Sequence, residues 1–119
     1  MHVPVILIAE REEAVRDSLQ IVLSDEGYRC FSYSNEEEVL EALEKEVISV
    51  IILDSQLAIG KGLLQVIKEQ YPQIKSIVIS SYASLERVQF SLKDLSDKII
   101  LKPFDFGELT SLVNSLCKA

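Results

Sequence analysis

The sequence predicts an α/β fold: a (βα)5 repeat that forms a doubly wound, five-stranded parallel sheet with helices on both faces. Five short apolar runs, rich in β-branched or aromatic residues, alternate with segments whose apolar residues recur at the helical period. Three of these runs are almost continuously apolar, which is typical of strands that helices bury on both faces. These two observations together favour this class over an all-helical or an antiparallel fold.

The five predicted strands differ in polarity. The first, third and fourth are the nearly continuous apolar runs, whereas the second and fifth contain more polar residues. In chain order the predicted ranges are Pro4–Ala9, Tyr28–Tyr33, Ser49–Leu53, Ser76–Ser80 and Lys98–Leu101. Because an edge strand has a neighbour on one side alone, the polarity places the second and fifth strands at the two edges of the sheet.

The segments between and after the strands predict five helices. Gly27 lies where the first helix would end. Ser34 with Glu37 forms a capping box before the second helix, and Asp105 with Glu108 forms another before the last. The apolar stripes are Val15, Leu19 and Val22; Val39, Leu40 and Leu43; Leu63, Leu64 and Ile67; Leu85, Val88, Leu92 and Leu95; and Leu112, Val113 and Leu116.

The composition predicts one folded domain over residues 1–119. With 48% hydrophobic and 26% charged residues, the chain has enough apolar surface for one core. Its net charge of −7 argues against direct nucleic-acid binding, because such domains are usually basic. No apolar run approaches the roughly 20 residues of a membrane span. Cys30 and Cys117 lack a C-x-x-C spacing, so we expect reduced thiols and a cytoplasmic protein.

Chemically active side chains follow four of the predicted strands. The acid-rich stretch Glu10–Glu13 follows the first, Asp54 the third, Ser80 and Ser81 the fourth, and Lys102 the fifth. In an open parallel sheet, ligands bind beyond the carboxyl ends of the strands, where these groups would meet. A carboxylate can attack phosphorus, Mg²⁺ can neutralise the developing charge, and a hydroxyl and an ammonium can bind phosphoryl oxygens. The sequence therefore predicts a phosphoryl-accepting site.

Four segments carry a resemblance to a known family, and together they cover essentially the whole chain. They are ILIAEREEAVRDSL, VIILDSQLAIGKG, IVISSYAS and KIILKPFDFGEL. In this order they resemble the receiver domain of two-component response regulators. The resemblance implies a flavodoxin-like three-layer sandwich with strand order 2-1-3-4-5. It also implies a phosphorelay role, in which a histidine kinase supplies the phosphoryl group and a conformational change passes the signal to an effector domain or downstream protein.

The resemblance also implies a role for each matching residue. Asp54 would be the phosphoacceptor, Ser80 the switch hydroxyl, and Lys102 the phosphate-binding lysine, joined to the following proline by a cis peptide bond. Glu10, Asp54 and the backbone carbonyl of Gln56 would hold Mg²⁺. Such a domain is not an enzyme in the ordinary sense, since at most it catalyses its own phosphorylation and dephosphorylation.

Arg11 departs from the family pattern, which has a second acid at this position. An arginine stays protonated and cannot ligate a metal. Two arrangements follow. Arg11 pairs with Asp54 and imitates the charge of the metal, which would make this a degenerate receiver that acts as a phosphorylation-independent interaction module. Alternatively, Arg11 turns outward while Glu12 or Glu13 helps to hold Mg²⁺, so that binding is weakened and the site still works.

Two further positions bear on signal output. Ile99 stands where the family has an aromatic switch residue, which places the usual ring rotation in doubt. Phe90 points away from the apolar stripe of the fourth predicted helix by about 170° at the helical period. We expect an exposed ring there, on the face of the fourth helix and fifth strand, and a homodimer or partner contact through it. A flavin- or nucleotide-binding protein of similar architecture is disfavoured, because the stretch Glu10–Glu13 would repel phosphate.

Overall fold

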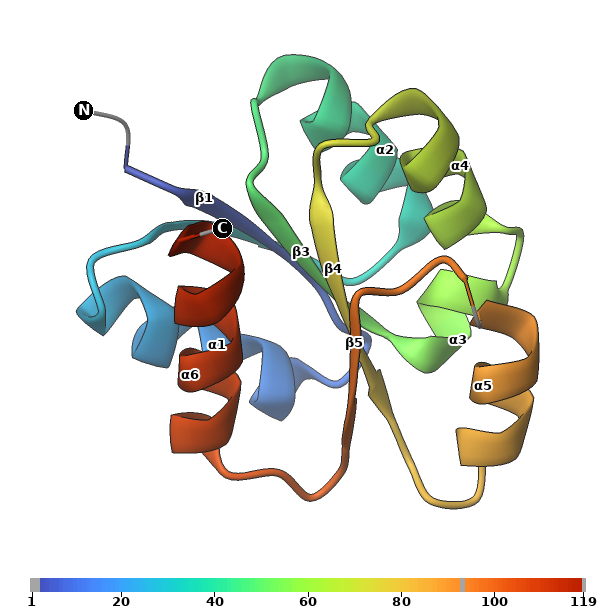
Figure 1. Ribbon diagram of the computed structural model, residues 1–119. Coiled ribbons are helices and arrows are strands. Elements are labelled where there is room, and N and C mark those ends of the chain that lie inside the picture. The colour runs from blue at the N-terminus through green and yellow to red at the C-terminus, as the bar shows by residue number, and fades with distance from the viewer. Residues whose placement is uncertain (1–2, 93, 119) are drawn as a thin grey trace.

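The computed structural model describes residues 3–92 and 94–118 and shows a five-stranded parallel sheet between two layers of helices (Figure 1). The strands run in the order β2-β1-β3-β4-β5. They are β1 (Val5–Ala9), β2 (Arg29–Tyr33), β3 (Val50–Asp54), β4 (Lys75–Ser80) and β5 (Lys98–Leu101). This confirms the predicted fold class and strand order, and it places the two more polar strands at the edges.

The helices divide between the two faces of the sheet. Helices α1 (Glu13–Asp25) and α6 (Phe106–Lys118) lie side by side on one face. The other face carries α2 (Glu36–Lys45), α3 (Ser55–Ile59), α4 (Leu63–Gln70) and α5 (Leu85–Leu92). Across residues 3–92 and 94–118, no helix combines the length and the apolar character that crossing a membrane requires.

Strand β1 shows how the chain fills both cores. Ile6 and Ile8 pack with α1 and α6, whereas Leu7 and Ala9 pack with the helices of the opposite face. All four side chains are fully buried, because successive residues of a strand point to opposite faces. This double burial is the reason for the continuous apolar runs. It also makes the central strands a rigid support for the residues at their carboxyl ends.

The predicted end of the first helix is confirmed. Gly27 has a positive φ of 94°, and its N–H donates to the carbonyl of Ser24 at 3.0 Å. The next N–H, that of Tyr28, donates to the carbonyl of Leu23 at 3.2 Å. These two bonds form a Schellman motif, in which glycine accommodates the left-handed backbone that lets the chain turn into β2.

The predicted capping boxes were wrong in detail. Helix α2 is capped one residue later than expected, by Asn35, whose Oδ1 accepts the N–H of Glu38 at 2.9 Å. An asparagine caps a helix about as well as a serine, so the spacing rule alone did not separate the two registers. Asp105 does bind the start of α6, but its carboxylate accepts the N–H of Gly107 at 2.6 Å.

Two segments also differ from the predicted helices. The residues after Asp54, which are not among the five predicted helices, form the short helix α3. The carboxylate of Asp54 caps this helix by accepting the N–H of Leu57 at 2.9 Å. The fourth predicted helix, whose apolar stripe included Leu95, is shorter than expected. It corresponds to α5, which ends at Leu92, and Leu95 packs against the core from the segment after it.

Candidate functional site

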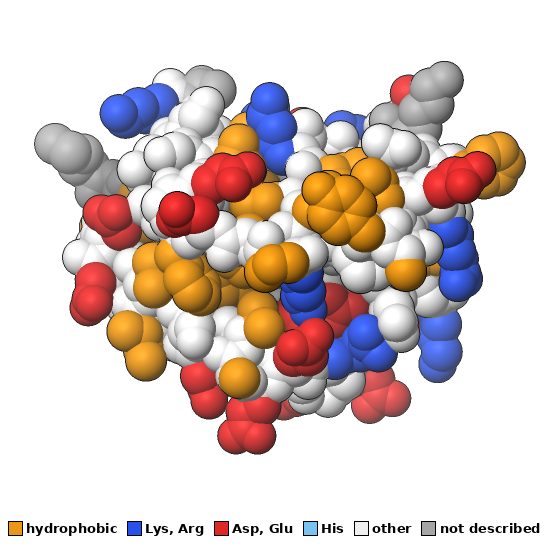
Figure 2. Space-filling view, turned by 90° about the horizontal axis from the view of Figure 1, so that it is seen from below, with side chains coloured by type: hydrophobic (Ala, Val, Ile, Leu, Met, Phe, Trp, Pro, Cys, Tyr) orange, Lys and Arg blue, Asp and Glu red, His pale blue; other side chains and the backbone are white. Residues whose placement is uncertain are grey.

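The predicted site lies at the carboxyl ends of the strands, on the lower edge of the molecule in Figure 1. Figure 2 looks onto this edge and shows acidic and basic side chains close together, with hydrophobic side chains on both sides of them. The strand order brings the ends of β1, β3 and β5 to this edge from distant parts of the sequence. Their polar side chains can therefore form one network.

Asp54 is the last residue of β3, and its position is fixed by that strand. β3 is buried along its whole length, and Asp54 itself is only 3% exposed. Its Oδ1 atom accepts the N–H of Leu57 at 2.9 Å. The same carboxylate thus ends a buried strand and caps the helix that follows it.

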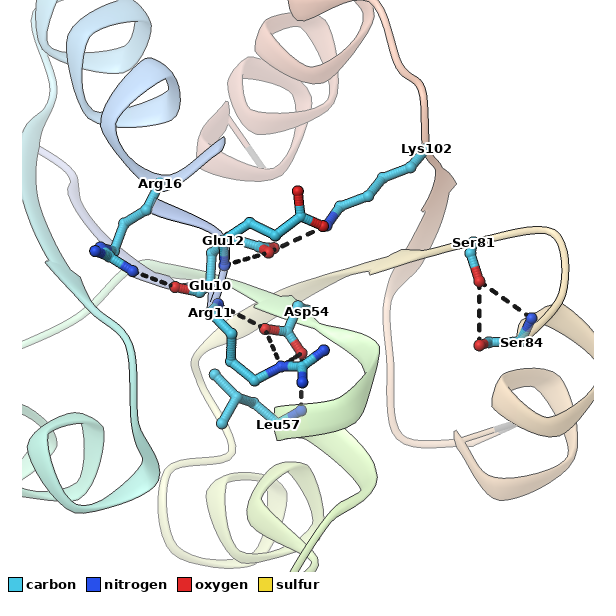
Figure 3. Close-up of polar contacts among 9 residues, drawn as sticks. All are labelled: Glu10, Arg11, Glu12, Arg16, Asp54, Leu57, Ser81, Ser84 and Lys102. Carbon is cyan, nitrogen blue, oxygen red and sulfur yellow. Dashed lines mark hydrogen bonds and ion pairs between the residues drawn. The ribbon is translucent and has the colours of Figure 1, made fainter. Parts of the chain in front are cut away.

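Arg11 contacts this carboxylate at two points (Figure 3). Its backbone N–H donates to Oδ2 of Asp54 at 2.8 Å. Its side-chain Nε lies 3.3 Å from Oδ1 and 3.2 Å from Oδ2. The arginine side chain is 47% exposed, while that of Asp54 is 4% exposed. Of the two arrangements predicted for Arg11, the structure shows the pairing with Asp54.

Lys102 and Glu10 form a second ion pair beside the first. Lys102 Nζ lies 3.1 Å from Oε1 of Glu10 and 2.8 Å from Oε1 of Glu12. Glu10 is 1% exposed, and its Oε1 also accepts the N–H of Glu12 at 3.1 Å. Among the described residues, no hydrogen bond or ion pair joins Lys102 to Asp54. The peptide bond from Lys102 to Pro103 is cis, as the resemblance implied.

Burial and hydrogen bonding shift the pKa values of Glu10, Lys102 and Glu12. Burial raises the pKa of Glu10, and the hydrogen bonds from Glu12 and Lys102 offset part of that effect. Burial lowers the pKa of Lys102, but its hydrogen bonds to Glu12 and Glu10 outweigh this, so that the pKa stands above its ordinary value. The pKa of Glu12 is lowered, chiefly by the hydrogen bond from Lys102.

Arg16 is a residue of this site that the sequence did not reveal. Its Nη1 donates to the backbone carbonyl of Glu10 at 2.8 Å and so supports the turn from β1 to α1 (Figure 3). That turn presents the backbone N–H of Arg11 to Asp54. No motif of the sequence marks it, because the contact is to a backbone carbonyl six residues away.

Ser80, the last residue of β4, and Ser81, which follows it, make no hydrogen bond to the carboxylates of the site among the described residues. Ser80 is 1% exposed and donates from its hydroxyl to the carbonyl of Ser81 at 2.9 Å. The hydroxyl of Ser81 donates to that of Ser84 at 3.1 Å and accepts the N–H of Ser84 at 3.2 Å, at the start of α5 (Figure 3). In this structure, Ser80 and Ser81 therefore bind the loop between β4 and α5.

The residues at this edge do not fit the Mg²⁺ ion that the resemblance implies. Both oxygens of Asp54 already accept hydrogen bonds from Arg11. The backbone carbonyl of Gln56 accepts the N–H of Gly60 at 2.9 Å within α3. Oε2 of Glu10 is a buried oxygen with no hydrogen-bond partner among the described residues. One free carboxylate oxygen is a poor site for a cation that prefers several oxygen ligands. No cluster of three or more His, Cys, Asp or Glu suited to a metal occurs in residues 3–92 and 94–118.

Curated relatives resemble this chain along most of its length. A putative NtrX-like response regulator of Rickettsia bellii is 32% identical over 117 residues, which are 95% of this chain and 24% of that protein. The response regulator protein PilR of Pseudomonas aeruginosa is 32% identical over 109 residues, 90% of this chain and 24% of that protein. The chain thus spans about a quarter of the length of these relatives.

Solved structures agree with the fold. NtrX from Brucella abortus, crystallised in complex with ADP, superposes with a TM-score of 0.89 at 25% identity, covering 98% of this chain and 27% of that one. A CheY-like receiver domain protein from Methanospirillum hungatei superposes with a TM-score of 0.87 at 29% identity, covering 98% and 95% of the two chains. The sequence model of the response regulator receiver domain matches residues 6–114. The chain therefore belongs to the response regulator receiver domains of two-component signal transduction.

Proposed function

We propose that this receiver domain accepts a phosphoryl group on Asp54 from a histidine kinase and passes the signal on by a conformational change. Receiver domains as a family are signalling modules that interact with histidine kinases and effector domains. The observation that carries the proposal is the position of Asp54. Its carboxylate stands at the rigid end of β3, and two backbone N–H groups and one guanidinium bind it.

This arrangement suits attack on phosphorus. An oxygen of Asp54 forms the new bond to phosphorus while the bond from phosphorus to the donor breaks and the donor keeps the electron pair. The N–H groups of Arg11 and Leu57 hold the carboxylate in a fixed orientation as this happens. Lys102 and Ser80 are proposed to bind phosphoryl oxygens after they leave Glu12 and the carbonyl of Ser81, their partners in the structure.

A second candidate function rests on the same arginine. If the guanidinium keeps Asp54 paired, the domain is a degenerate receiver that binds partners without phosphorylation. Both oxygens of Asp54 are engaged by Arg11, and Asp54 is almost fully buried. Ile99 lies partly buried against the core, so the aromatic switch that couples phosphorylation to output in the family has no counterpart at that position.

Exposure to acetyl phosphate tests the two candidates. We expect the purified chain to gain the mass of one phosphoryl group, and the Asp54→Ala variant to gain none, by intact mass spectrometry. Absence of the gain in the unmodified chain under every donor and metal condition, together with a gain in Arg11→Asp, would instead establish the degenerate receiver.

The remaining proposals concern the partners and setting of the domain. We propose a single cytoplasmic receiver domain over residues 1–119, without a nucleic-acid-binding surface of its own. Its output face is proposed to be α5 and β5, where the ring of Phe90 is 88% exposed. An apolar ring in water favours a protein contact, and a second copy of the chain is the homodimer partner we propose.

A further inference from the structure

We infer that Arg11 is the resident cation of this site, and that phosphoryl transfer to Asp54 proceeds without Mg²⁺. This inference rests on the proposed function, that Asp54 is a phosphoacceptor. It departs from the family, whose members generally bind Mg²⁺ at the phosphorylation site.

Each buried carboxylate of the site already has a cation of its own. Asp54 is paired with Arg11, and Glu10 is paired with Lys102. A divalent ion bound to Asp54 would lie within a few ångströms of the guanidinium, and like charges so close in a buried site repel strongly. The charge that Mg²⁺ would neutralise is therefore already largely neutralised by the chain itself.

The way Arg11 binds leaves part of its side chain available. It holds Asp54 through Nε and through its own backbone N–H. No hydrogen bond joins either of its Nη atoms to another residue among those described. The side chain is 47% exposed on the rim from which a phosphoryl donor would arrive. Two N–H-bearing nitrogens are thus free to bind phosphoryl oxygens, which is the planar, paired geometry by which arginine recognises phosphate.

Transfer of the phosphoryl group to Asp54 balances in atoms, electrons and charge without a metal ion. With acetyl phosphate as donor, an Asp54 oxygen forms a bond to phosphorus, the bond from phosphorus to the acetyl oxygen breaks, and acetate leaves with the electron pair. The total charge of reactants and products is the same, so no proton has to be supplied. Arg11 stabilises the charge on the equatorial oxygens, as the arginine supplied to other phosphoryl-transfer sites does. Its backbone N–H remains on the carboxyl group that the reaction modifies.

The test compares phosphorylation rates in EDTA and in MgCl2 by intact mass, with acetyl phosphate as donor. We expect the unmodified chain to react at rates within about twofold of each other. We expect the Arg11→Asp variant, which restores an acid, to react at least tenfold faster with Mg²⁺ than with EDTA. Arg29→Gln is the matched control, since Arg29 lies on β2 over the ring of Phe31 and away from this site, and it should behave as the unmodified chain.

Each other outcome overturns a specific statement. A tenfold or larger stimulation of the unmodified chain by Mg²⁺ refutes the role of Arg11 and leaves the proposed function intact. Phosphorylation of Arg11→Asp alone shows that the arginine blocks the reaction, which also refutes this inference. No phosphorylation of any variant refutes the proposed function. Arg11→Lys, which keeps the charge but has one nitrogen in place of three, should remain independent of Mg²⁺ and react more slowly, and it serves if Arg11→Asp does not fold.

Discussion

Arg11 binds Asp54 through both its backbone and its side chain. The backbone nitrogen lies 2.8 Å and Nε 3.2 Å from the same oxygen, Oδ2, and both donate hydrogen bonds to it. The backbone contact depends on the turn after β1, which Arg16 supports through the carbonyl of Glu10, and not on the side chain at position 11. Substitutions at this position therefore remove the side-chain charge and the Nε hydrogen bonds, while the backbone contact remains. This separation makes Arg11 a clean position at which to test electrostatics.

Arg11→Gln should destabilise the fold moderately. The variant loses the guanidinium but keeps the backbone N–H of position 11 and that of Leu57 on Asp54. A hydrogen bond to a charged group contributes about 1.5–3 kcal/mol, and exposure of the arginine favours the lower part of that range. Urea unfolding should report a loss of about 1–2 kcal/mol. An unchanged unfolding free energy would mean that the pair contributes nothing.

Mg²⁺ should stabilise Arg11→Asp and leave the unmodified chain unaffected. The variant would place three carboxylates together, at positions 10, 11 and 54, which repel one another until a cation binds. A ligand at about 100 times its Kd adds about 2.7 kcal/mol, or roughly 8–15 °C in Tm for a domain of this size. Thermal unfolding with MgCl2 or with EDTA measures the difference. An equal rise in the Tm of the variant and of the unmodified chain would mean that Mg²⁺ binds at a site independent of Arg11.

Lys102→Met should destabilise the fold, and more at neutral than at acidic pH. Removal of Nζ leaves Oε1 of Glu10 with one donor, the N–H of Glu12. The pKa of Glu10 is already raised by burial and would rise further. A raised carboxyl pKa favours the neutral form, so the penalty is absent below the ordinary pKa of glutamate and grows as pH rises above it. We expect a loss of about 3 kcal/mol at pH 7.5 and less at pH 5, by denaturant unfolding.

The control for Lys102→Met is the double variant that combines it with Glu10→Gln. A neutral amide at position 10 removes the unpaired buried charge, so the double variant should recover part of the stability at pH 7.5. If the double variant is as unstable as Lys102→Met at both pH values, the packing of the lysine stem matters and its charge does not.

Phe90→Ser should weaken self-association without loss of stability. The ring is 88% exposed, so the substitution removes little buried surface, and the unfolding free energy should change by less than about 0.5 kcal/mol. Sedimentation velocity would show a shift from dimer to monomer. Val47→Ser is a matched control, with an equally exposed side chain (89%) on the segment between α2 and β3. Identical sedimentation of Phe90→Ser and the unmodified chain would contradict the contact.

Tyr28 should ionise well above the ordinary pKa of a tyrosine. Burial, with the nearby Cys117 as a lesser cause, raises its pKa to about 12, and its hydroxyl donates to Oδ1 of Asn114 in α6. Because the pKa is higher in the folded state, its contribution to stability is complete below about pH 10 and is lost as pH rises toward 12. Absorbance of the phenolate, compared between the unmodified chain and Tyr28→Phe, isolates this group. A transition near pH 10 for Tyr28 would contradict the prediction.

The sequence was most informative where one local rule sufficed. Apolar runs such as Val50–Leu53 predicted the central strands, because burial on both faces excludes polar residues. Gly27 marked the end of α1, because its positive φ is unfavourable for other residues. By contrast, Asn35 and Ser34 are about equally good caps by local rules, and the structure has Asn35 in that role.

For the site, the sequence by itself determined which chemical groups meet. The order of β and α segments brings Glu10, Asp54 and Lys102 to one edge, since parallel strands end on the same side. Only the tertiary structure decided how they pair. Lys102 binds Glu10 and Glu12, while Asp54 takes Arg11. Pairing depends on distances of a few ångströms between side chains 43 to 92 positions apart in the chain. Local sequence rules describe residues that are near one another in the chain. They therefore predict which charged residues lie at this edge, whereas the tertiary structure determines which of them form ion pairs.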